Sequence, residues 1–157
     1  MLEIHIPGHD RAMNLSRLVL DYNGTVACDG ELIFGVRERL ETLSANLNIH
    51  ILTADTFGSV REKLAGIPCK LSIIPREEQA QEKLHYVHGL GLSTCVCVGN
   101  GRNDGLMLRE AVLGIAVVQT EGAAMAAVLA ADVVTSSILD ALDLLLHPLR
   151  LIATLRS

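Results

Sequence analysis

Aromatic residues and long apolar runs are both scarce in this sequence. It contains two Phe, two Tyr and no Trp, although 50% of its 157 residues are hydrophobic. The core must therefore be aliphatic, which is typical of a buried parallel sheet rich in Val, Ile and Leu. No apolar run approaches the roughly 18 residues that span a bilayer, and residues 1–9 lack a signal-peptide pattern. We expect a soluble, cytoplasmic protein with no membrane partner.

A basic cluster and a C-x-x-C motif are also absent. The net charge of -5 argues against a nucleic-acid partner. Among the four cysteines, Cys95 and Cys97 lie two apart in an apolar strand, so they share one face and are expected to pack rather than to bind metal. Cys28 and Cys69 stand alone in the sequence. A structural metal site built on cysteine is therefore not expected.

Strand-like and helix-like segments alternate along most of the chain. Short apolar runs predict strands at 17–20, 49–52, 71–74, 94–98, 115–118 and 133–135. Helical spacing or capping signals lie between and after them, at 36–47, 56–66, 77–88, 105–114, 122–131 and 138–156. Strands separated by helices form right-handed crossovers. We predict one α/β domain over residues 1–157, a doubly wound parallel sheet covered by helices on both faces.

Five local features refine this prediction. Residues 2–6 alternate enough to form an additional edge strand, and residues 24–30 form a loop or a small hairpin. Thr56 is the expected N-cap of its helix, and the acidic pair at 77–78 is expected in the first turn of the next one. Residues 138–156 are expected to be mostly helix, with Pro148 inside it. This last segment is apolar on more than one face, so it is either deeply buried or forms a homo-oligomer.

Polar residues follow three of the predicted strands at the point where each strand ends. These residues are Asp21, Thr53 and the run at 99–104. Ligands of open α/β sheets bind beyond the carboxyl ends of the strands. Taken alone, Asp21 could equally be an ordinary strand-terminating residue, and the Asn-Gly pairs could be ordinary turns. Lys83 alone would be a solvated residue on a helix.

The order and spacing of these residues resemble the four motifs of the haloacid dehalogenase-like (HAD) phosphotransfer superfamily. D-Y-N-G-T at 21–25 resembles its D-x-D-G-T signature, and Thr53 and Lys83 match its second and third motifs. G-N-G-R-N-D at 99–104 resembles the fourth motif, G-D-G-x-N-D. One motif alone is weak, but four in order are specific. The resemblance covers about residues 16–140 and is strongest to small stand-alone relatives of P-type ATPase phosphorylation domains.

The resemblance implies a nucleophile and a phosphate site. Asp21 would accept a phosphoryl group as an aspartyl phosphate that water later cleaves. Thr53 and Lys83 would bind the phosphate, together with backbone groups at Ala54 and Gly24.

The resemblance also implies a Mg²⁺ ion, because two anions must be brought together. Its ligands would be the Asp21 carboxylate, the backbone carbonyl of Asn23 and a side chain of the fourth motif, Asn100 or Asp104. These are the hard oxygen ligands that Mg²⁺ prefers.

The sequence departs from the superfamily pattern in two positions. Asn23 stands where the phosphatases carry an aspartate that acts as general acid and base, a role that an amide cannot perform. Asn100 stands where an aspartate binds the metal. Segments 21–53 and 53–83 are filled by sheet and helix signals and leave no room for a cap domain. The prediction is a capless, slow Mg²⁺-dependent phosphohydrolase acting on a phosphorylated small molecule or macromolecule.

Two other functions are compatible with parts of this pattern. A non-catalytic module that binds Mg²⁺ and phosphate, and acts through a protein partner, would explain both asparagines. A response-regulator receiver domain also has a phosphorylated Asp on a doubly wound sheet. In a receiver domain that Asp would follow the third strand, whereas Asp21 follows the first long one.

Overall fold

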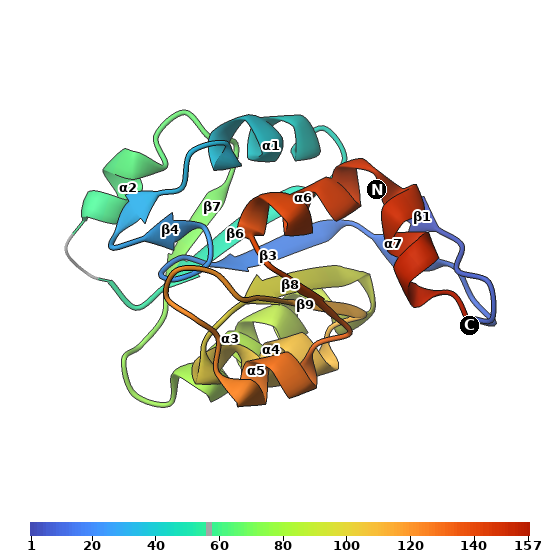
Figure 1. Cartoon of the computed structure of the whole chain (residues 1–157). Helices are drawn as coiled ribbons and strands as arrows, with labels where there is room; N and C mark the ends of the chain where they lie inside the picture. Colours follow the sequence, from blue (N-terminus) through green and yellow to red (C-terminus); the bar gives the residue numbers. More distant parts are fainter. Residues whose placement is uncertain (56–57) are drawn as a thin grey trace.

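A parallel sheet of six strands forms the centre of the computed structural model, which describes residues 1–55 and 58–157 (Figure 1). The strand order is β10-β9-β8-β3-β6-β7, and every neighbouring pair is parallel. The strands are β3 (Arg17–Asp21), β6 (Asn48–Thr53), β7 (Lys70–Ile73), β8 (Cys95–Gly99), β9 (Leu113–Val117) and β10 (Val133–Thr135). The predicted N-cap Thr56 lies outside the described residues.

The direction of chain winding reverses at β3. The chain moves from β3 to β6 and β7 on one side, then crosses back to β8 and continues to β9 and β10 on the other. Asp21 on β3 is paired with Leu52 on β6, and Leu20 on β3 with Val98 on β8. The carboxyl ends of β3, β6 and β8 therefore lie together at the switch point, where ligands of such sheets bind.

Helices cover both faces of this sheet, as predicted (Figure 1). One face carries α1 (Val36–Leu43), α2 (Ser59–Lys63) and α6 (Ile138–Leu146). The other carries α3 (Gln79–Leu90), α4 (Gly105–Glu110) and α5 (Met125–Ala130), with the 3₁₀ turns η1 (Leu92–Thr94) and η2 (Arg102–Asp104) at the ends of β8.

The core is aliphatic and has two parts, one on each face of the sheet. Leu18 and Leu20 of β3 belong to one cluster and Val19 to the other, as strand alternation requires. Cys95 and Cys97 are both fully buried in the second cluster. The expectation that these two cysteines pack on one face is confirmed.

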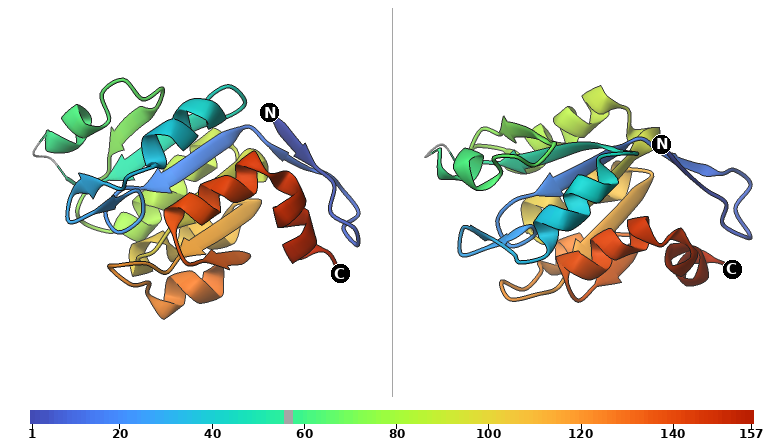
Figure 2. Two further views of the ribbon diagram at one scale, coloured as in Figure 1. Left: turned by 45° about the horizontal axis from the view of Figure 1, so that its top comes forward. Right: turned by 90° about the horizontal axis from the view of Figure 1, so that it is seen from above.

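The N-terminal segment does not join the central sheet, so the predicted edge strand is wrong. β1 (Leu2–Ile4) pairs antiparallel with β2 (Met13–Leu15) in a separate hairpin. Figure 2 places this hairpin beside α7 (Pro148–Leu155), at the end of the molecule away from α2. The Ser157 amide donates to the Pro7 carbonyl over 3.3 Å. The alternating pattern of residues 2–6 therefore reflects packing in a hairpin.

Several helices are shorter than predicted, and two of the differences have a clear local cause. Residues 138–156 form two helices, α6 and α7, because Pro148 lacks an amide hydrogen and occupies the first turn of a new helix instead of the interior of one. Helix α3 begins at Gln79, and Glu78 precedes it with a φ of 54°. The acidic residue in its first turn is thus Glu82 rather than the pair at 77–78.

Between the strands that carry the candidate motifs, the described residues contain no cap domain. The segment from β3 to β6 holds the predicted small hairpin, β4 (Ala27–Cys28) with β5 (Glu31–Leu32), and α1. The described part of the segment from β6 to β7 holds α2. Across residues 1–55 and 58–157, the helices are too short to cross a bilayer.

Candidate functional site

Asp21 is the last residue of β3 and is 7% exposed. The chain turns sharply after it, with the Gly24 amide donating to the Ala27 carbonyl over 2.8 Å. Gly24 has a φ of 79°, and an added Cβ would lie 2.4 Å from Asn100 Nδ2. Only glycine fits this position. The Asn-Gly pair is therefore part of a turn that brings the first and fourth motifs into contact.

Lys83 reaches Asp21 from α3 and is buried between two carboxylates. Its Nζ donates to Asp21 Oδ1 and to Asp104 Oδ1, each over 2.7 Å. Lys83 is 1% exposed and Asp104 is fully buried. The other oxygen of Asp104, Oδ2, accepts from the amides of Asn100 (3.1 Å) and Gly101 (2.8 Å). Lys83 is thus a buried residue of the site and not a solvated helix residue.

Burial is the largest influence on the pKa of Asp21. It raises the pKa of Asp21, and the nearby Asp104 carboxylate raises it further, to about 7, against the lowering effects of Lys83 and Thr25. Burial alone would lower the pKa of Lys83, but the two carboxylates outweigh it and raise the pKa above its ordinary value. Two carboxylates thus face one ammonium, an arrangement that a bound cation would stabilise.

Thr25 links Asp21 to Asn100, a contact that the motif reading missed. Its hydroxyl lies 3.1 Å from Asp21 Oδ2 and 3.3 Å from Asn100 Oδ1. Asn100 Nδ2 donates to the Gly122 carbonyl over 3.0 Å, which turns the amide oxygen toward Asp21. Thr25 ends the D-Y-N-G-T run, so its place in the motif was the signal that could have identified it.

A cavity of about 590 Å³ opens beside these residues. Of the eight residues predicted to form the site, six line it and two do not. The lining six are Asp21, Asn23, Thr53, Ala54, Lys83 and Asn100. Gly24 and Asp104 are buried behind the wall. Thr53 Oγ1 accepts from the Asp55 amide over 3.1 Å, so its hydroxyl hydrogen remains available to a ligand.

Four further polar residues line the cavity: Asp55, Arg76, Gln79 and Asn103. Sequence reasoning missed the first three, whereas Asn103 lies in the polar run at 99–104. Asn103 Nδ2 donates to Gln79 Oε1 over 2.6 Å, which joins η2 to the start of α3. Arg76 lies just beyond the carboxyl end of β7, and Thr53 lies at the carboxyl end of β6. The rule that polar residues at strand ends mark the site would have found Arg76 had it been applied to this strand.

Gln119 supports the site from outside the cavity and was also missed. Its Nε2 donates to the carbonyls of Gly24 (3.1 Å) and Thr25 (2.7 Å), and its Oε1 accepts from the Ile138 amide over 2.9 Å. Gln119 therefore fixes the turn after Asp21 to the start of α6. It lies two residues beyond β9, again at the carboxyl end of a strand.

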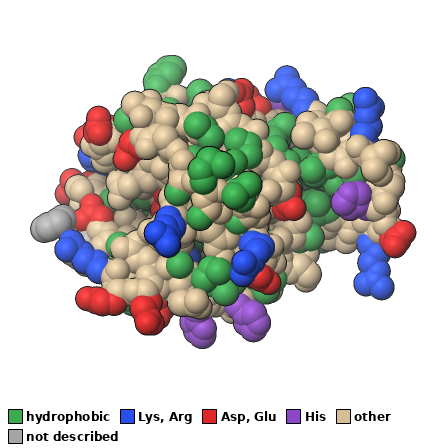
Figure 3. Space-filling view, turned by 60° about the horizontal axis from the view of Figure 1, so that its bottom comes forward, with side chains coloured by type: hydrophobic (Ala, Val, Ile, Leu, Met, Phe, Trp, Pro, Cys, Tyr) green, Lys and Arg blue, Asp and Glu red, His purple; other side chains and the backbone are tan. Residues whose placement is uncertain are grey.

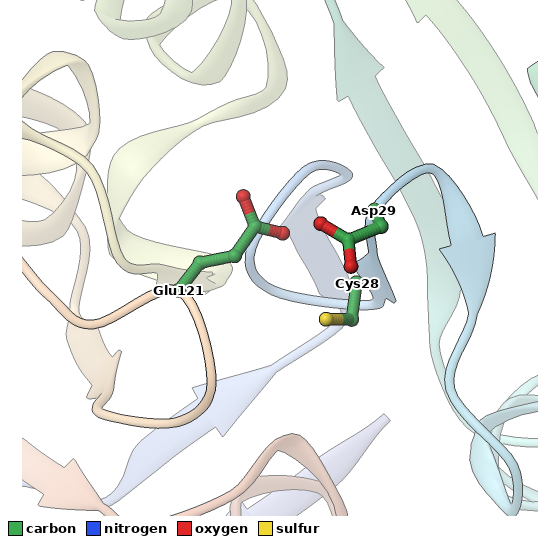
Figure 4. A group of neighbouring side chains, drawn as sticks. All are labelled: Cys28, Asp29 and Glu121. Atoms are coloured by element: carbon green, nitrogen blue, oxygen red, sulfur yellow. The ribbon is translucent and has the colours of Figure 1, made fainter.

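One other group of potential metal ligands occurs among the described residues. Cys28, Asp29 and Glu121 bring ligand atoms within 4.8 Å of one another. Figure 4 shows Cys28 and Asp29, at the end of β4, facing Glu121 on a neighbouring loop. Both carboxylates are exposed to solvent, where acidic groups commonly gather without an ion. Cys28, which stands alone in the sequence, is therefore close to two acidic residues in the fold.

Solved structures that superpose on this chain include HAD superfamily proteins. A proposed HAD superfamily (subfamily III A) hydrolase from Legionella pneumophila superposes with a TM-score of 0.73 at 16% identity, covering 91% of this chain and 88% of that one. The 3-deoxy-D-manno-octulosonate 8-phosphate (KDO 8-phosphate) phosphatase of Moraxella catarrhalis, solved with magnesium, phosphate and KDO, gives 0.69 at 18% identity over 92% and 95% of the chains. The cobalt-bound enzyme from Haemophilus influenzae gives 0.72 at 16% identity over 86% and 89%. This chain therefore has the HAD fold, and residues 1–55 and 58–157 contain no cap domain.

Two archaeal proteins are more similar in sequence, and no protein-family model matches the chain. Both are uncharacterized proteins of Methanocaldococcus jannaschii. MJ0073 is 51% identical over 61 residues, which span 39% of this chain and 66% of MJ0073. MJ0072 is 51% identical over 39 residues, which span 25% of this chain and 89% of MJ0072. The chain belongs to the same family as MJ0072.

Proposed function

We propose that this protein is a Mg²⁺-dependent phosphohydrolase that acts through an aspartyl phosphate on Asp21. The observation that carries the proposal is the convergence of Asp21, Thr53 and Lys83 on one cavity at the switch point of a HAD fold. Each comes from a different element, β3, β6 and α3. An ordinary strand-end carboxylate would not be paired with a buried lysine from another part of the chain.

The proposed reaction has two steps at Asp21. A carboxylate oxygen attacks phosphorus while the ester P–O bond breaks, and the leaving alkoxide takes a proton from solvent. Water then attacks the phosphoryl group, the bond from phosphorus to Asp21 breaks, and inorganic phosphate and a proton are released. The Lys83 ammonium and the Thr53 hydroxyl stabilise the charged phosphoryl oxygens in both steps. Asn23 has no proton to transfer, so the reaction is slow with poor leaving groups.

The donor atoms beside Asp21 fit a hard divalent cation. The Asp21 carboxylate and the Asn100 amide oxygen both face the Thr25 hydroxyl, and Asn23 supplies a backbone carbonyl from the same loop. Asp104 is fully buried and its two oxygens accept three hydrogen bonds, so we assign it a supporting role behind Asn100. When bound, Mg²⁺ supplies positive charge that lets a phosphate dianion approach a carboxylate.

The substrate class follows from the cavity and from the fold's known members. The M. catarrhalis neighbour is a phosphatase of a sugar-acid phosphate. The cavity of this chain is open and polar, with no cap domain over it. We propose a phosphorylated small molecule as substrate, with a phosphorylated macromolecule as the alternative that an uncovered site permits.

A phosphatase screen of the purified protein with Mg²⁺ tests this proposal. Release of phosphate from aryl and alkyl phosphates should require Mg²⁺ and should be lost in Asp21→Ala. Ser59→Ala offers a control, since Ser59, the first residue of α2, is exposed and lies outside the cavity. Activity that survives Asp21→Ala in folded protein would refute the role of Asp21.

A second candidate is a module that binds Mg²⁺ and phosphate without turnover and acts through a protein partner. The two amides at Asn23 and Asn100 favour it, because each replaces a carboxylate of the superfamily pattern. It predicts phosphate binding that depends on Mg²⁺ and on Lys83, with no hydrolysis of any ester in the screen. Phosphate release above the Asp21→Ala background excludes it.

A further inference from the structure

A second hollow adjoins the candidate cavity on the side of α3 and η2. It measures about 420 Å³ and is lined by Arg76, Glu78, Gln79, Ala80, Arg102 and Asn103. Three of these residues, Arg76, Gln79 and Asn103, also line the cavity that holds Asp21. The two spaces therefore share one wall, and a ligand bound at Asp21 can extend into the second hollow.

Two arginines, Arg76 and Arg102, flank this hollow. Arg76 and Arg102 form no ion pair or side-chain hydrogen bond in the part of the chain that the structure describes. By contrast, Arg39 is held by Asp143 over 2.8 Å. Both guanidinium groups are exposed and available to a ligand. A planar guanidinium offers paired donors that match a carboxylate or a phosphate.

Apart from Arg76 at its rim, the inner cavity has one basic side chain, and that side chain is already paired with carboxylates. Its lysine, Lys83, is shared between Asp21 and Asp104 at 2.7 Å from each. Electrostatic attraction for an anionic substrate must come from a bound cation and from the arginines at the rim. Arg76 is the cationic side chain common to both spaces, which places positive charge on the path from the reacting phosphate to the outside.

We propose that the second hollow binds another anionic group of the substrate, a carboxylate or a phosphate carried by the leaving-group part of the molecule. This inference rests on the proposed phosphohydrolase function. Arg76 and Arg102 would hold the second anion, and the Gln79–Asn103 pair would contact the chain of atoms between the two anions. The substrate class is then a phosphate ester with a second negative group.

Glu78 provides an internal control of this electrostatic argument. It lines the same hollow, is exposed, and carries a negative charge opposite in effect to the arginines. Neutralising it should favour a second anion, whereas neutralising either arginine should disfavour one. Variants of the same rim therefore predict changes of opposite sign, which a general loss of folding cannot produce.

The test compares three esters that differ in the leaving group. Glycerol 3-phosphate has a neutral leaving group, 3-phosphoglycerate carries a carboxylate, and glycerol 1,3-bisphosphate carries a second phosphate. For each of the two esters that carry a second anionic group, kcat/KM is divided by kcat/KM for glycerol 3-phosphate, with Mg²⁺ present. This ratio is the measured quantity. We expect Arg76→Gln and Arg102→Gln each to lower this ratio roughly tenfold, since a charge-assisted pair of hydrogen bonds is lost. Glu78→Gln should raise it, and Arg150→Gln, on exposed α7, should leave it unchanged.

The outcomes separate this inference from the proposed function. A fall of the ratio with 3-phosphoglycerate alone identifies a carboxylate site, and a fall with the bisphosphate alone identifies a phosphate site. Equal ratios in the wild-type protein and both arginine variants overturn the inference while the phosphohydrolase activity stands. Should no ester be hydrolysed, the proposed function fails, and calorimetry with the same intact esters and Mg²⁺ decides the subsite. Tighter binding of a second anion that is lost in Arg76→Gln would then support it, and equal binding of all three esters would overturn it.

Discussion

Asn23 is the residue that most limits the chemistry of the proposed site. It lies at the mouth of the cavity, exposed to solvent, on the turn that follows Asp21. Phosphatases of the HAD superfamily, by the resemblance of the motifs, carry an aspartate there that protonates the leaving group. An amide holds a ligand in place but cannot transfer a proton. The first step then depends strongly on how readily the leaving group departs without a proton, and in the second step no side chain at position 23 can take a proton from the attacking water.

Replacing Asn23 by Asp should therefore change turnover in a way that depends on the substrate. With an activated aryl phosphate, Asn23→Asp should raise kcat only modestly, because that leaving group needs little protonation. With an alkyl phosphate the gain should be larger, within the roughly 10²–10⁴-fold range of a positioned acid or base. Steady-state kinetics on both esters measure the difference.

Fresh protein and mass spectrometry are the controls for this comparison. Asn23 and Asn100 both precede glycine, a context prone to deamidation, and slow conversion to Asp would imitate the variant. An equal gain on both esters would mean that position 23 does not act through leaving-group protonation. No gain on either, in folded protein, would favour the non-catalytic module.

The raised pKa of Asp21 predicts how stability depends on pH in metal-free protein. Its pKa rises from 3.8 to about 7 on folding because of burial and the Asp104 carboxylate. The folded state thus holds the Asp21 proton more tightly than the unfolded state does. The resulting contribution to the free energy of unfolding is fully present below pH 4 and is lost as the pH rises to 7. The free energy of unfolding of the wild type, relative to Asp21→Asn, should fall across this window.

Urea unfolding in EDTA at several values between pH 4.5 and 7.5 measures this difference between the two proteins. The expected slope approaches about 1.4 kcal/mol per pH unit at most. A difference in the free energy of unfolding that is constant with pH would contradict this. It would mean that Asp21 is ionised throughout, because Lys83 lowers its pKa by more than burial raises it.

At the scale of elements, alternation of apolar runs and helical spacing predicted the central sheet closely. All six strands lie within two residues of their predicted positions, because buried parallel strands are continuous apolar runs bounded by turn residues. The predictions of secondary structure are wrong where contacts between distant segments or a single proline determine the conformation. The hairpin of β1 and β2 has a strand-like pattern but no partner in the central sheet, and Pro148 starts a helix that the pattern alone would continue.

The candidate site was predicted in its centre and missed at its edge. Asp21, Thr53, Lys83 and Asn100 could be selected from the sequence because their order along the chain matches a known set of motifs. All four line one cavity. The outer residues, such as Arg76, have no fixed place in such motifs, and their positions depend on loop conformation. The burial of Asp104 behind Asn100 likewise depends on the η2 turn, which the sequence did not reveal.

The short connection from β8 to η2 requires glycine at its start. An added Cβ at Gly99 would lie 2.5 Å from Asp104 Cγ, so Gly99→Ala must displace the carboxylate that holds Lys83. We expect a loss of about 1–3 kcal/mol in the free energy of unfolding and weaker phosphate binding. Denaturant unfolding and calorimetry measure both.

Gly105 is the matched control for this prediction. It lies at the start of α4, and its added Cβ would meet only Ala126 O at 3.6 Å, an ordinary contact. Gly105→Ala should be neutral or stabilising by up to about 1 kcal/mol. Equal losses in the two variants would contradict a specific role for the Gly99–Asp104 contact.

For the whole molecule, the described residues contain no cap domain that could cover the site. The oligomeric state stays a prediction. Most apolar residues of 138–152 pack into the protein itself, including Leu142, Leu145 and Leu151, while Leu149 remains 80% exposed. Hydrophobic side chains also gather on the face shown in Figure 3. Met125 and Leu129 of α5 are exposed as well. We expect a homo-oligomer that covers part of this surface. A monomer mass in light scattering at high concentration would contradict this.

Binding of beryllofluoride tests the central claim, phosphoryl transfer to Asp21, most directly. This ion imitates a phosphoryl group on a carboxylate, and ¹⁹F NMR reports its bound form without requiring turnover or a known substrate. The account predicts bound fluorine signals that need Mg²⁺, disappear in Asp21→Asn and weaken in Thr53→Ala and Lys83→Met. Bound signals that persist in folded Asp21→Asn, or their absence from the wild type at saturating Mg²⁺, would contradict it.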